Sequence, residues 1–391
     1  MRILLLHNKY QYAGGEDKVF ESEGDLLASH DHLVERLVFD NREIATLLDK
    51  IRSGLTGIYN FRSAKIVTEK IKEFRPDVIH VHNFVPLASP SVFFAAKANN
   101  VPVVMTLHNY RLICPSATLY HKNKIYERSM RSIFPIDAIL KGVYRNSIPQ
   151  TAALALVIAF HNLIGTWRNK VSKFIVLTDF ARSKFLGSRL NVSPDQLMLK
   201  PNFIADPGNG IETREDFFLY VGRLSKEKGI DSLLNAFSHS DHKLVIIGDG
   251  PMQEQVESYV KAKQNVKYLG FQSRAAIMDR MKRAKALIVP STWYEGFPIT
   301  ILEALATGTP VIGSRLGGIA EIIKDKFNGL LFEAANEAAL LETLDEFHTV
   351  DRHALSVNAR KTYLELYTPE TNYRILMDIY TEAMKNIHHG K

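Results

Sequence analysis

The sequence predicts an α/β fold with two Rossmann-like, doubly wound domains that face each other across a cleft. Three observations predict this fold. The chain has 391 residues, which is enough for two domains with separate hydrophobic cores. Short apolar runs alternate with helical patterns, as they do in βαβ units. The alternation runs twice, with a change near Pro201, so we expect one parallel sheet in each half.

The first half, residues 1–203, is expected to form the N-terminal domain. Its apolar runs predict strands at 3–6, 34–39, 78–81, 103–107, 174–177 and 198–200. Helical patterns separate these runs, for example at 17–29 and 91–99.

The second half, residues 204–369, is expected to form the C-terminal domain after a linker at 206–210. Apolar runs predict its strands at 217–221, 243–247, 266–269, 286–289, 311–313 and 330–332. We expect the last helix, at 370–391, to pack back on the N-terminal domain.

The composition is that of a soluble globular protein, with 46% hydrophobic and 23% charged residues. The single cysteine, Cys114, excludes an intrachain disulfide and a cysteine zinc site, and it fits a reducing compartment. The apolar run that follows Met1 is too short for a signal peptide, so we expect a cytoplasmic protein.

The positive charge is concentrated in one region. The formal net charge is +7, and residues 121–200 alone hold 13 basic and 4 acidic side chains. This distribution suggests a polyanion or an anionic membrane surface as partner, and we expect a peripheral contact with the membrane surface and no nucleic-acid partner. A merely solvated basic face is the alternative.

One apolar segment lies inside the basic region. Residues 146–167 carry no charge, but they include Pro149, Gln150, His161 and Asn162, so we do not expect the segment to span a membrane. Cations precede and follow it, which suits an interfacial helix. A buried helix under the sheet is the other interpretation.

Two glutamates suggest the chemistry of the second half. Glu295 and Glu303 have seven residues between them, and Pro298 favours a helix start there. The free N–H groups of that first turn, near Ile299 and Thr300, suit a phosphate. The two carboxylates suit hydroxyl groups instead, which indicates a sugar.

Glycine-rich turns follow the first strand of each half. Gly15 lies in the N-terminal turn, beside Glu16 and Asp17. In the other half, Arg223 and Lys228 bracket the turn, so two cations could meet one diphosphate. The next strand ends in a similar turn, which contains Gly250.

These motifs occur in the order found in the family 4 glycosyltransferases, and the chain resembles that family over nearly its whole length. The motifs that carry the resemblance are Gly222-Arg223, Lys228-Gly229, Gly248 to Pro251, Glu295 to Glu303 and Gly317 to Glu321. The resemblance implies retaining enzymes of the GT-B fold. Ala320 departs from the pattern, because many members have proline there.

The resemblance also implies roles for individual residues. Glu295 would face the donor sugar, Glu303 would hold the ribose, and Arg223 and Lys228 would hold the diphosphate. The turn at Phe271 would pack the base. The backbone that meets sugar and phosphate would be that of Gly296, Phe297, Pro298, Ile299 and Thr300, with Gly15 on the other domain.

His108 ends the predicted strand at 103–107, and the resemblance implies that it contacts the donor sugar. We therefore group it with Glu295, Arg223 and Lys228 as catalytic candidates. The acceptor-binding candidates are Glu16, Asp17, His108, Tyr110 and Arg111.

His80 and His82 share one face of a strand, as metal ligands sometimes do. The sequence offers no third ligand at a suitable spacing and no Asp-x-Asp motif. We therefore interpret both histidines as polar lining or structure, and we expect no metal and no other cofactor.

The expected function is a retaining sugar transfer from a nucleotide-sugar, UDP-linked rather than GDP-linked, to a lipid-diphosphate-linked or growing saccharide acceptor. Such enzymes serve bacterial surface polysaccharide synthesis (capsule, O-antigen or exopolysaccharide). No convincing nucleophile is present, which favours front-face attack assisted by the leaving phosphate. The alternatives are a soluble acceptor, a nucleotide-sugar epimerase of the same fold, and a non-catalytic nucleotide-sugar or polyanion binder.

Overall fold

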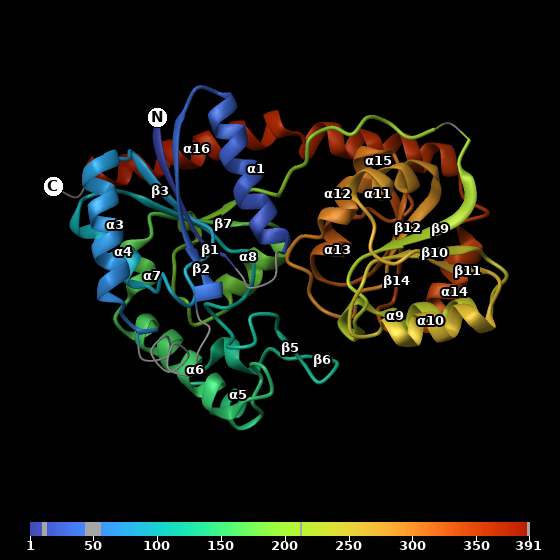
Figure 1. Cartoon of the computed structure of the whole chain (residues 1–391), viewed down its shortest axis with the longest axis horizontal. Helices are drawn as coiled ribbons and strands as arrows, with labels where there is room; N and C mark the ends of the chain where they lie inside the picture. Colours follow the sequence, from blue (N-terminus) through green and yellow to red (C-terminus); the bar gives the residue numbers. More distant parts are fainter. Residues whose placement is uncertain (10–13, 44–55, 212, 389–391) are drawn as a thin grey trace. The chain divides into compact units, whose positions relative to one another are not determined.

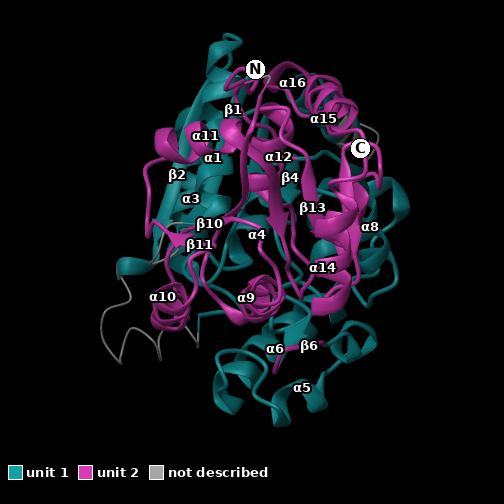
Figure 2. Cartoon of the chain, turned by 90° about the vertical axis from the view of Figure 1, so that its right-hand side faces the viewer, with its two compact units in different colours: residues 1–121, 126–201, 372–391 teal, residues 122–125, 202–371 magenta. Residues whose placement is uncertain are grey.

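The computed structural model describes residues 1–9, 14–43, 56–211 and 213–388, and it forms two compact units. Unit 1 contains residues 1–121, 126–201 and 372–391, and unit 2 contains residues 122–125 and 202–371 (Figure 2).

Unit 1 is built on a six-stranded parallel sheet with the order β2-β1-β3-β4-β7-β8. Its strands are β1 (Arg2–Lys9), β2 (Leu33–Asp40), β3 (Val78–Val81), β4 (Val103–Thr106), β7 (Lys173–Val176) and β8 (Leu197–Leu199). Register is set by pairs such as Ile3 with Val78. Leu4 and Leu5 on β1 are both fully buried although they point to opposite faces, which is why a parallel strand covered on both sides reads as a continuous apolar run.

Helices surround this sheet (Figure 1). They are α1 (Gly15–Ser29), η1 (Asn41–Glu43), α3 (Phe61–Phe74), α4 (Ser91–Ala98), η2 (Arg128–Arg131), α5 (Ile136–Leu140), α6 (Ile148–Leu163), α7 (Thr166–Lys170), α8 (Asp179–Leu186) and η3 (Pro194–Gln196). Two short strands, β5 (Tyr120–His121) and β6 (Lys124–Ile125), pair with each other outside the main sheet.

Unit 2 has a second six-stranded parallel sheet, with the order β11-β10-β9-β12-β13-β14. Its strands are β9 (Glu215–Val221), β10 (Leu244–Ile247), β11 (Val266–Tyr268), β12 (Ala284–Val289), β13 (Val311–Ser314) and β14 (Gly329–Phe332). From the central pair β9 and β12, successive strands are added outward on both sides of the sheet. This strand order is that of a doubly wound dinucleotide-binding fold. The predicted α/β class with two such sheets is therefore confirmed.

The helices of unit 2 cover both faces of its sheet. They are η4 (Lys226–Lys228), α9 (Ile230–Ser238), α10 (Gln253–Ala262), α11 (Arg274–Arg283), α12 (Ile299–Ala306), α13 (Gly317–Ile322), α14 (Glu337–Glu346) and α15 (Arg352–Leu366). One buried cluster joins Phe218 of the sheet to Phe237 of α9 and Phe347 after α14, so these elements share a core.

The last helix, α16 (Pro369–His388), belongs to unit 1 from residue 372 onward. Its Tyr380 is fully buried and its hydroxyl lies 2.7 Å from His80 Nδ1 on β3. Lys173 on β7 donates to Glu382 at 2.7 Å. The chain thus returns to its first sheet after completing the second.

No described helix combines the length and the apolar character that crossing a bilayer requires. The segment at 146–167 forms α6 and the first residues of α7.

Candidate functional site

In unit 2, the loops that follow β9 and β12 meet at the point where the strand order reverses. Such switch points, at the carboxyl ends of parallel strands, are where doubly wound sheets bind ligands. Lys228 from the first loop donates to Glu295 Oε1 from the second at 2.7 Å. Glu295 also accepts a hydrogen bond from Ser291 at 2.6 Å. Two residues far apart in the sequence are therefore held in one ion pair.

A glycine makes this close approach possible. Gly229 has φ +76°, and a Cβ added there would overlap the carbonyl oxygen of Pro290 at the end of β12. The amide of Thr292 donates to the carbonyl of Glu227 at 2.9 Å, which ties the two loops together through their backbones. Any larger residue at 229 would push the loops apart.

The charge of Glu295 is set by its surroundings. Burial raises the pKa of this carboxyl, but the nearby ammonium of Lys228 and the hydrogen bond from Ser291 lower it more, so the net pKa lies below the ordinary value. Glu295 is therefore ionised at neutral pH, and it is positioned to accept hydrogen bonds.

The other donor-binding residues predicted in unit 2 lie at the same edge of its sheet. Arg223 follows β9 and is exposed, and its backbone carbonyl accepts a hydrogen bond from Tyr220 at 2.8 Å. Gly250 follows β10, where a Cβ would collide with the backbone of Leu224. Phe271 follows β11 and is 77% exposed, which is unusual for a phenylalanine and leaves its ring open to stacking.

Helix α12 begins at this edge as well. The segment Gly296–Phe297–Pro298 leads into it, and Pro298 at the N-cap provides no side-chain hydrogen bond to the amides of Ile299 and Thr300. Those first-turn N–H groups suit an anion. Glu303 lies one turn further along α12, is mostly buried, and has Arg274 Nε at 3.7 Å.

In unit 1, a pocket lies at the carboxyl ends of β3 and β4. Three predicted residues line it: Glu16, His108 and Arg111. Gly15, the first residue of α1, is exposed. Asp17 makes contacts within unit 1. Its carboxylate lies 2.8 Å from His7 Nε2 and also accepts a hydrogen bond from the backbone amide of Gly14.

Tyr110 does not line this pocket. Its ring is buried and stacks on Phe185 with 5.7 Å between the ring centroids. This placement gives Tyr110 a packing role, and nothing in the local sequence distinguishes it from the pocket residues on either side.

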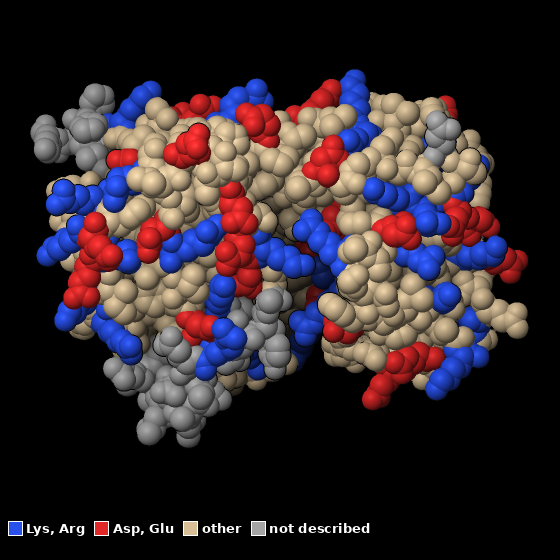
Figure 3. Space-filling model, turned by 45° about the horizontal axis from the view of Figure 1, so that its top comes forward, with Lys and Arg blue, Asp and Glu red and all other residues tan. Residues whose placement is uncertain are grey.

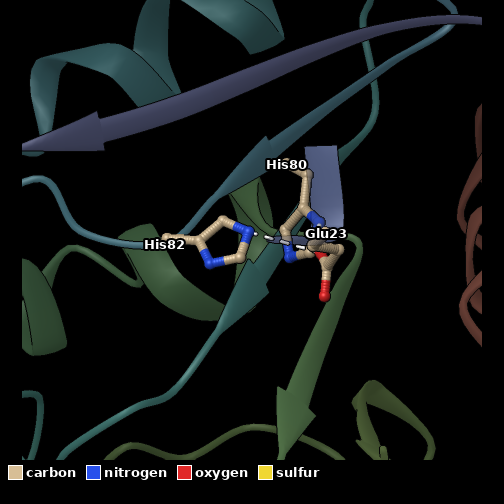
Figure 4. A group of neighbouring side chains, drawn as sticks. All are labelled: Glu23, His80 and His82. Carbon is tan, nitrogen blue, oxygen red and sulfur yellow. Dashed lines mark ion pairs between the residues drawn. The ribbon is translucent and has the colours of Figure 1, made fainter. Parts of the chain in front are cut away.

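The sequence offers no third ligand at a suitable spacing from His80 and His82, but the fold brings one to them. Glu23 of α1 lies beside both histidines, and the three candidate ligand atoms are all within 4.8 Å of one another (Figure 4). Spacing along the chain could not reveal this group, because Glu23 comes from a different element. One feature of the sequence does indicate that Glu23 is buried: it lies on the same side of α1 as the apolar residues Phe20 and Leu27.

The group formed by Glu23, His80 and His82 fits an ion-pair network better than a metal site. Lys200 Nζ lies 2.8 Å from Glu23 Oε2, and both side chains are buried, so an ammonium already neutralises the carboxylate. The ring nitrogens of His80 are hydrogen-bonded to Tyr380 at 2.7 Å and to Thr106 at 2.8 Å. The network joins α1, β3, β4 and α16 to the end of β8.

His82 connects this network to the pocket. Its Nε2 faces Glu23 Oε1 at 3.3 Å, and its Nδ1 lies 3.1 Å from Nε2 of His108. Burial lowers the pKa of His82 to about 4 and holds the pKa of His108 well below its ordinary value, so both rings are neutral at pH 7. Because a carboxylate only accepts, we assign the proton of His82 to Nε2 and that of His108 to its own Nε2.

Two family models match adjoining parts of the chain. The model described as Glycosyltransferase Family 4 matches residues 42–204, and the model described as Glycosyl transferases group 1 matches residues 203–362. The second match contains all of the loops that meet around Lys228 and Glu295.

The curated relatives that match include a glycosyltransferase and a protein from a cps region. An uncharacterized glycosyltransferase of Methanocaldococcus jannaschii is 32% identical over 185 residues, which cover 45% of this chain and 47% of the relative. The chain therefore spans about half the length of this relative. An uncharacterized 42.6 kDa protein in the cps region of Klebsiella pneumoniae is 24% identical over 82% of this chain and 79% of its own.

Among solved structures, Anabaena Alr3699/HepE in complex with UDP has the same fold. It superposes with a TM-score of 0.67 at 17% identity, over 97% of this chain and all of the other. At this identity the likeness concerns the fold alone.

Proposed function

Because the chain belongs to the family 4 glycosyltransferases and has the GT-B fold, we propose that it transfers a sugar from a nucleotide-sugar with retention at the anomeric carbon. The observation that carries this proposal is the Lys228–Glu295 pair at the start of α12, where cations, amides and a carboxylate occupy one sheet edge. Cations and backbone amides bind a phosphate, and a carboxylate accepts hydrogen bonds from sugar hydroxyl groups.

The donor we propose is a UDP-sugar rather than a GDP-sugar. The diphosphate would lie between Arg223, Lys228 and the first amides of α12, with the base on Phe271 and the ribose at Glu303. The UDP complex of the Anabaena protein of the same fold supports this choice. The sugar itself would be hexosyl or N-acetylhexosaminyl.

The reaction would proceed on one face of the sugar. The bond between the anomeric carbon and the phosphate oxygen breaks, and the diphosphate leaves with the electron pair. The acceptor oxygen attacks from the same side, and its proton passes to the departing phosphate oxygen. Glu295 is paired with Lys228 and Ser291, so it orients sugar hydroxyls and is not the nucleophile.

Charge builds on the diphosphate as this bond breaks. Lys228, Arg223 and the amides of α12 bind that charge more strongly in the transition state than in the ground state, which lowers the barrier. We propose that no metal is needed for this step. Transfer by the purified enzyme should be the same in EDTA as in magnesium, and a strict magnesium requirement would contradict the proposal.

The acceptor we propose is a lipid-diphosphate-linked or growing saccharide of a bacterial surface polysaccharide, bound by unit 1 at the pocket with His108, Glu16 and Arg111. The Klebsiella relative from a cps region supports this class. The enzyme would act as a peripheral protein at the cytoplasmic side of the membrane. A soluble acceptor is the alternative.

Two substitutions test the donor site. Arg223→Ala and Glu303→Ala should each lower transfer from a UDP-sugar by about 100-fold or more, because each removes a charged contact to the donor. Exposed Glu254→Ala on α10 is the matched control and should be neutral. Near wild-type transfer by either site variant would reject the proposed donor site. Isomerised donor formed without acceptor would identify an epimerase instead.

A further inference from the structure

We propose that α5, α6 and the turn before α5 form a surface that docks unit 1 on an anionic lipid bilayer. This apolar face consists of nine exposed side chains: Ile133, Phe134, Ile136, Leu140, Ile148, Leu156, Phe160, Leu163 and Ile164. The inference builds on the proposed function, since a lipid-linked acceptor resides in such a bilayer.

The exposed side of α6 has the wrong polarity for contact with water. Positions 149, 153, 156, 160 and 163 are exposed and recur with the period of a helix. None of them is charged, and Leu163 is 71% exposed. The opposite side packs inward through residues such as Ala155 and Ile158. A helix on the surface of a soluble protein normally places polar residues where α6 has these apolar ones.

The apolar side chains are concentrated in one place. Of the 21 large hydrophobic residues that are exposed among those the structure describes, nine lie between residues 133 and 164. Helix α5 packs against α6, and both views show the two helices together at the lower end of unit 1 (Figures 1 and 2). Scattered exposed leucines need no explanation, but a continuous apolar face indicates an interaction site.

Cations border this apolar face. Arg131, Lys141, Arg145 and Arg168 are all exposed. Asp137 is the only acidic residue between 128 and 178, and Lys141 donates to it at 2.9 Å. Elsewhere the two signs are mixed, as on the face of the molecule in Figure 3. Four cations against one acidic residue leave a net positive charge, and apolar side chains with such a border complement a bilayer with anionic headgroups.

The length of α6 fits a helix that lies in the interface between a bilayer and water. The 16 residues of α6 extend about 24 Å, and the apolar stripe follows this length. The helix also packs against α5 and α7, and its inner residues such as Ala155 and Ile158 are buried, so it would insert only its exposed side chains. A second copy of the chain would bury the apolar side chains too, but it would bring the same cations together.

Vesicle sedimentation of the full chain tests the proposal. The wild-type protein should bind vesicles in which about a third of the lipid is phosphatidylglycerol and bind pure phosphatidylcholine much more weakly. Combined Leu140→Ser, Leu156→Ser and Leu163→Ser should weaken binding about tenfold or more. Combined Lys141→Gln, Arg145→Gln and Arg168→Gln should remove the preference for anionic lipid.

The matched control changes three exposed apolar residues of unit 2, Val357→Ser, Leu364→Ser and Leu366→Ser, and should bind as the wild type does. Unchanged thermal unfolding of each variant verifies the fold. Wild-type binding by the leucine variant, or no sedimentation of the wild-type chain, would overturn the proposal. So would a wild-type dimer that the leucine variant converts to a monomer. Binding is measured without donor or acceptor, so a wrong assignment of the transfer reaction would leave this result unchanged.

Discussion

At the residue scale, the buried pair of Lys200 and Glu23 offers the sharpest test of the network in unit 1. Both side chains are about 1% exposed. Burial raises the pKa of the Glu23 carboxyl, but Lys200 and His80 lower it more, so the net pKa lies well below its ordinary value. The carboxylate is thus held in its charged form by Lys200, which follows β8, and by His80 on β3.

Lys200→Met should lower the free energy of unfolding by about 3–5 kcal/mol, because it leaves a buried carboxylate without its ammonium. The double variant with Glu23→Gln should recover much of this loss. Lys243→Met, which removes an exposed ion pair with Asp216, is the control and should cost about 1 kcal/mol or less. Urea denaturation measures all three. Equal losses for Lys200→Met and Lys243→Met would refute the buried pair.

His82 makes stability depend on pH. Its pKa is about 4 in the folded state because of burial, against an ordinary value of 6.5. Between these values the unfolded chain binds a proton that the folded chain does not, so stability falls as the pH falls from 6.5 to about 4. The contribution of His82 alone is roughly 3 kcal/mol, and His108 acts in the same direction.

Urea denaturation at pH 7 and at pH 5 should therefore show lower stability at the acidic pH, with a smaller difference in His82→Asn. The asparagine carbonyl can still accept from His108 but does not titrate. Exposed His239→Asn is the control and should retain the wild-type difference. If His82→Asn loses as much stability between pH 7 and pH 5 as the wild type does, the neutral state of His82 does not cause the pH dependence.

At the element scale, the loop that carries Lys228 is fixed by the glycine that follows it. Gly229 ends η4 and begins α9 with φ +76°, and it lies against Pro290 at the end of β12. The position of the ammonium beside Glu295 therefore depends on a backbone conformation that side chains with a Cβ rarely adopt.

Gly229→Ala should destabilise the protein by more than about 2 kcal/mol, from the strained φ and from the overlap with Pro290. It should also abolish thermal stabilisation by UDP, because the two loops can no longer meet. Gly15→Ala is the control for stability alone: an added methyl there meets no atom within 4 Å, so the free energy of unfolding should change by less than about 1 kcal/mol. Wild-type stability and UDP response in Gly229→Ala would contradict this account of the loop.

At the scale of the whole molecule, the chain completes unit 1 only after it has built unit 2. Leu376, Ile379 and Tyr380 of α16 are essentially fully buried, and the helix contributes hydrogen bonds to β3 and β7. Unit 1 therefore includes α16 from residue 372 onward, whereas unit 2 is continuous apart from residues 122–125.

A chain that ends at Thr368 should lose the protection of backbone amides in β3 and β7 against hydrogen exchange, while β9 and β12 stay protected. UDP should still bind to it, because the loops around Lys228 and Glu295 remain. Truncation at Tyr380 gives an intermediate control that keeps part of the helix. Full protection of unit 1 in the shorter chain would show that α16 is dispensable.

The sequence by itself determined the fold class, the two sheets and the family. Apolar strands, glycine turns and motifs such as Arg223 to Gly229 are local patterns, and each can be recognised without knowing what it packs against. The same holds for the loop and helix from Glu295 to Glu303. The roles of these residues stay predictions until donor binding is measured.

Only the tertiary structure decided which distant residues meet. Glu23 joins His80 and His82, Lys200 neutralises Glu23, and Tyr110 turns to Phe185 instead of the pocket. It also decided that one side of α6 is buried and the other exposed, which the composition of 146–167 left open. These outcomes depend on sheet order and helix packing, which bring together positions that no spacing along the chain relates.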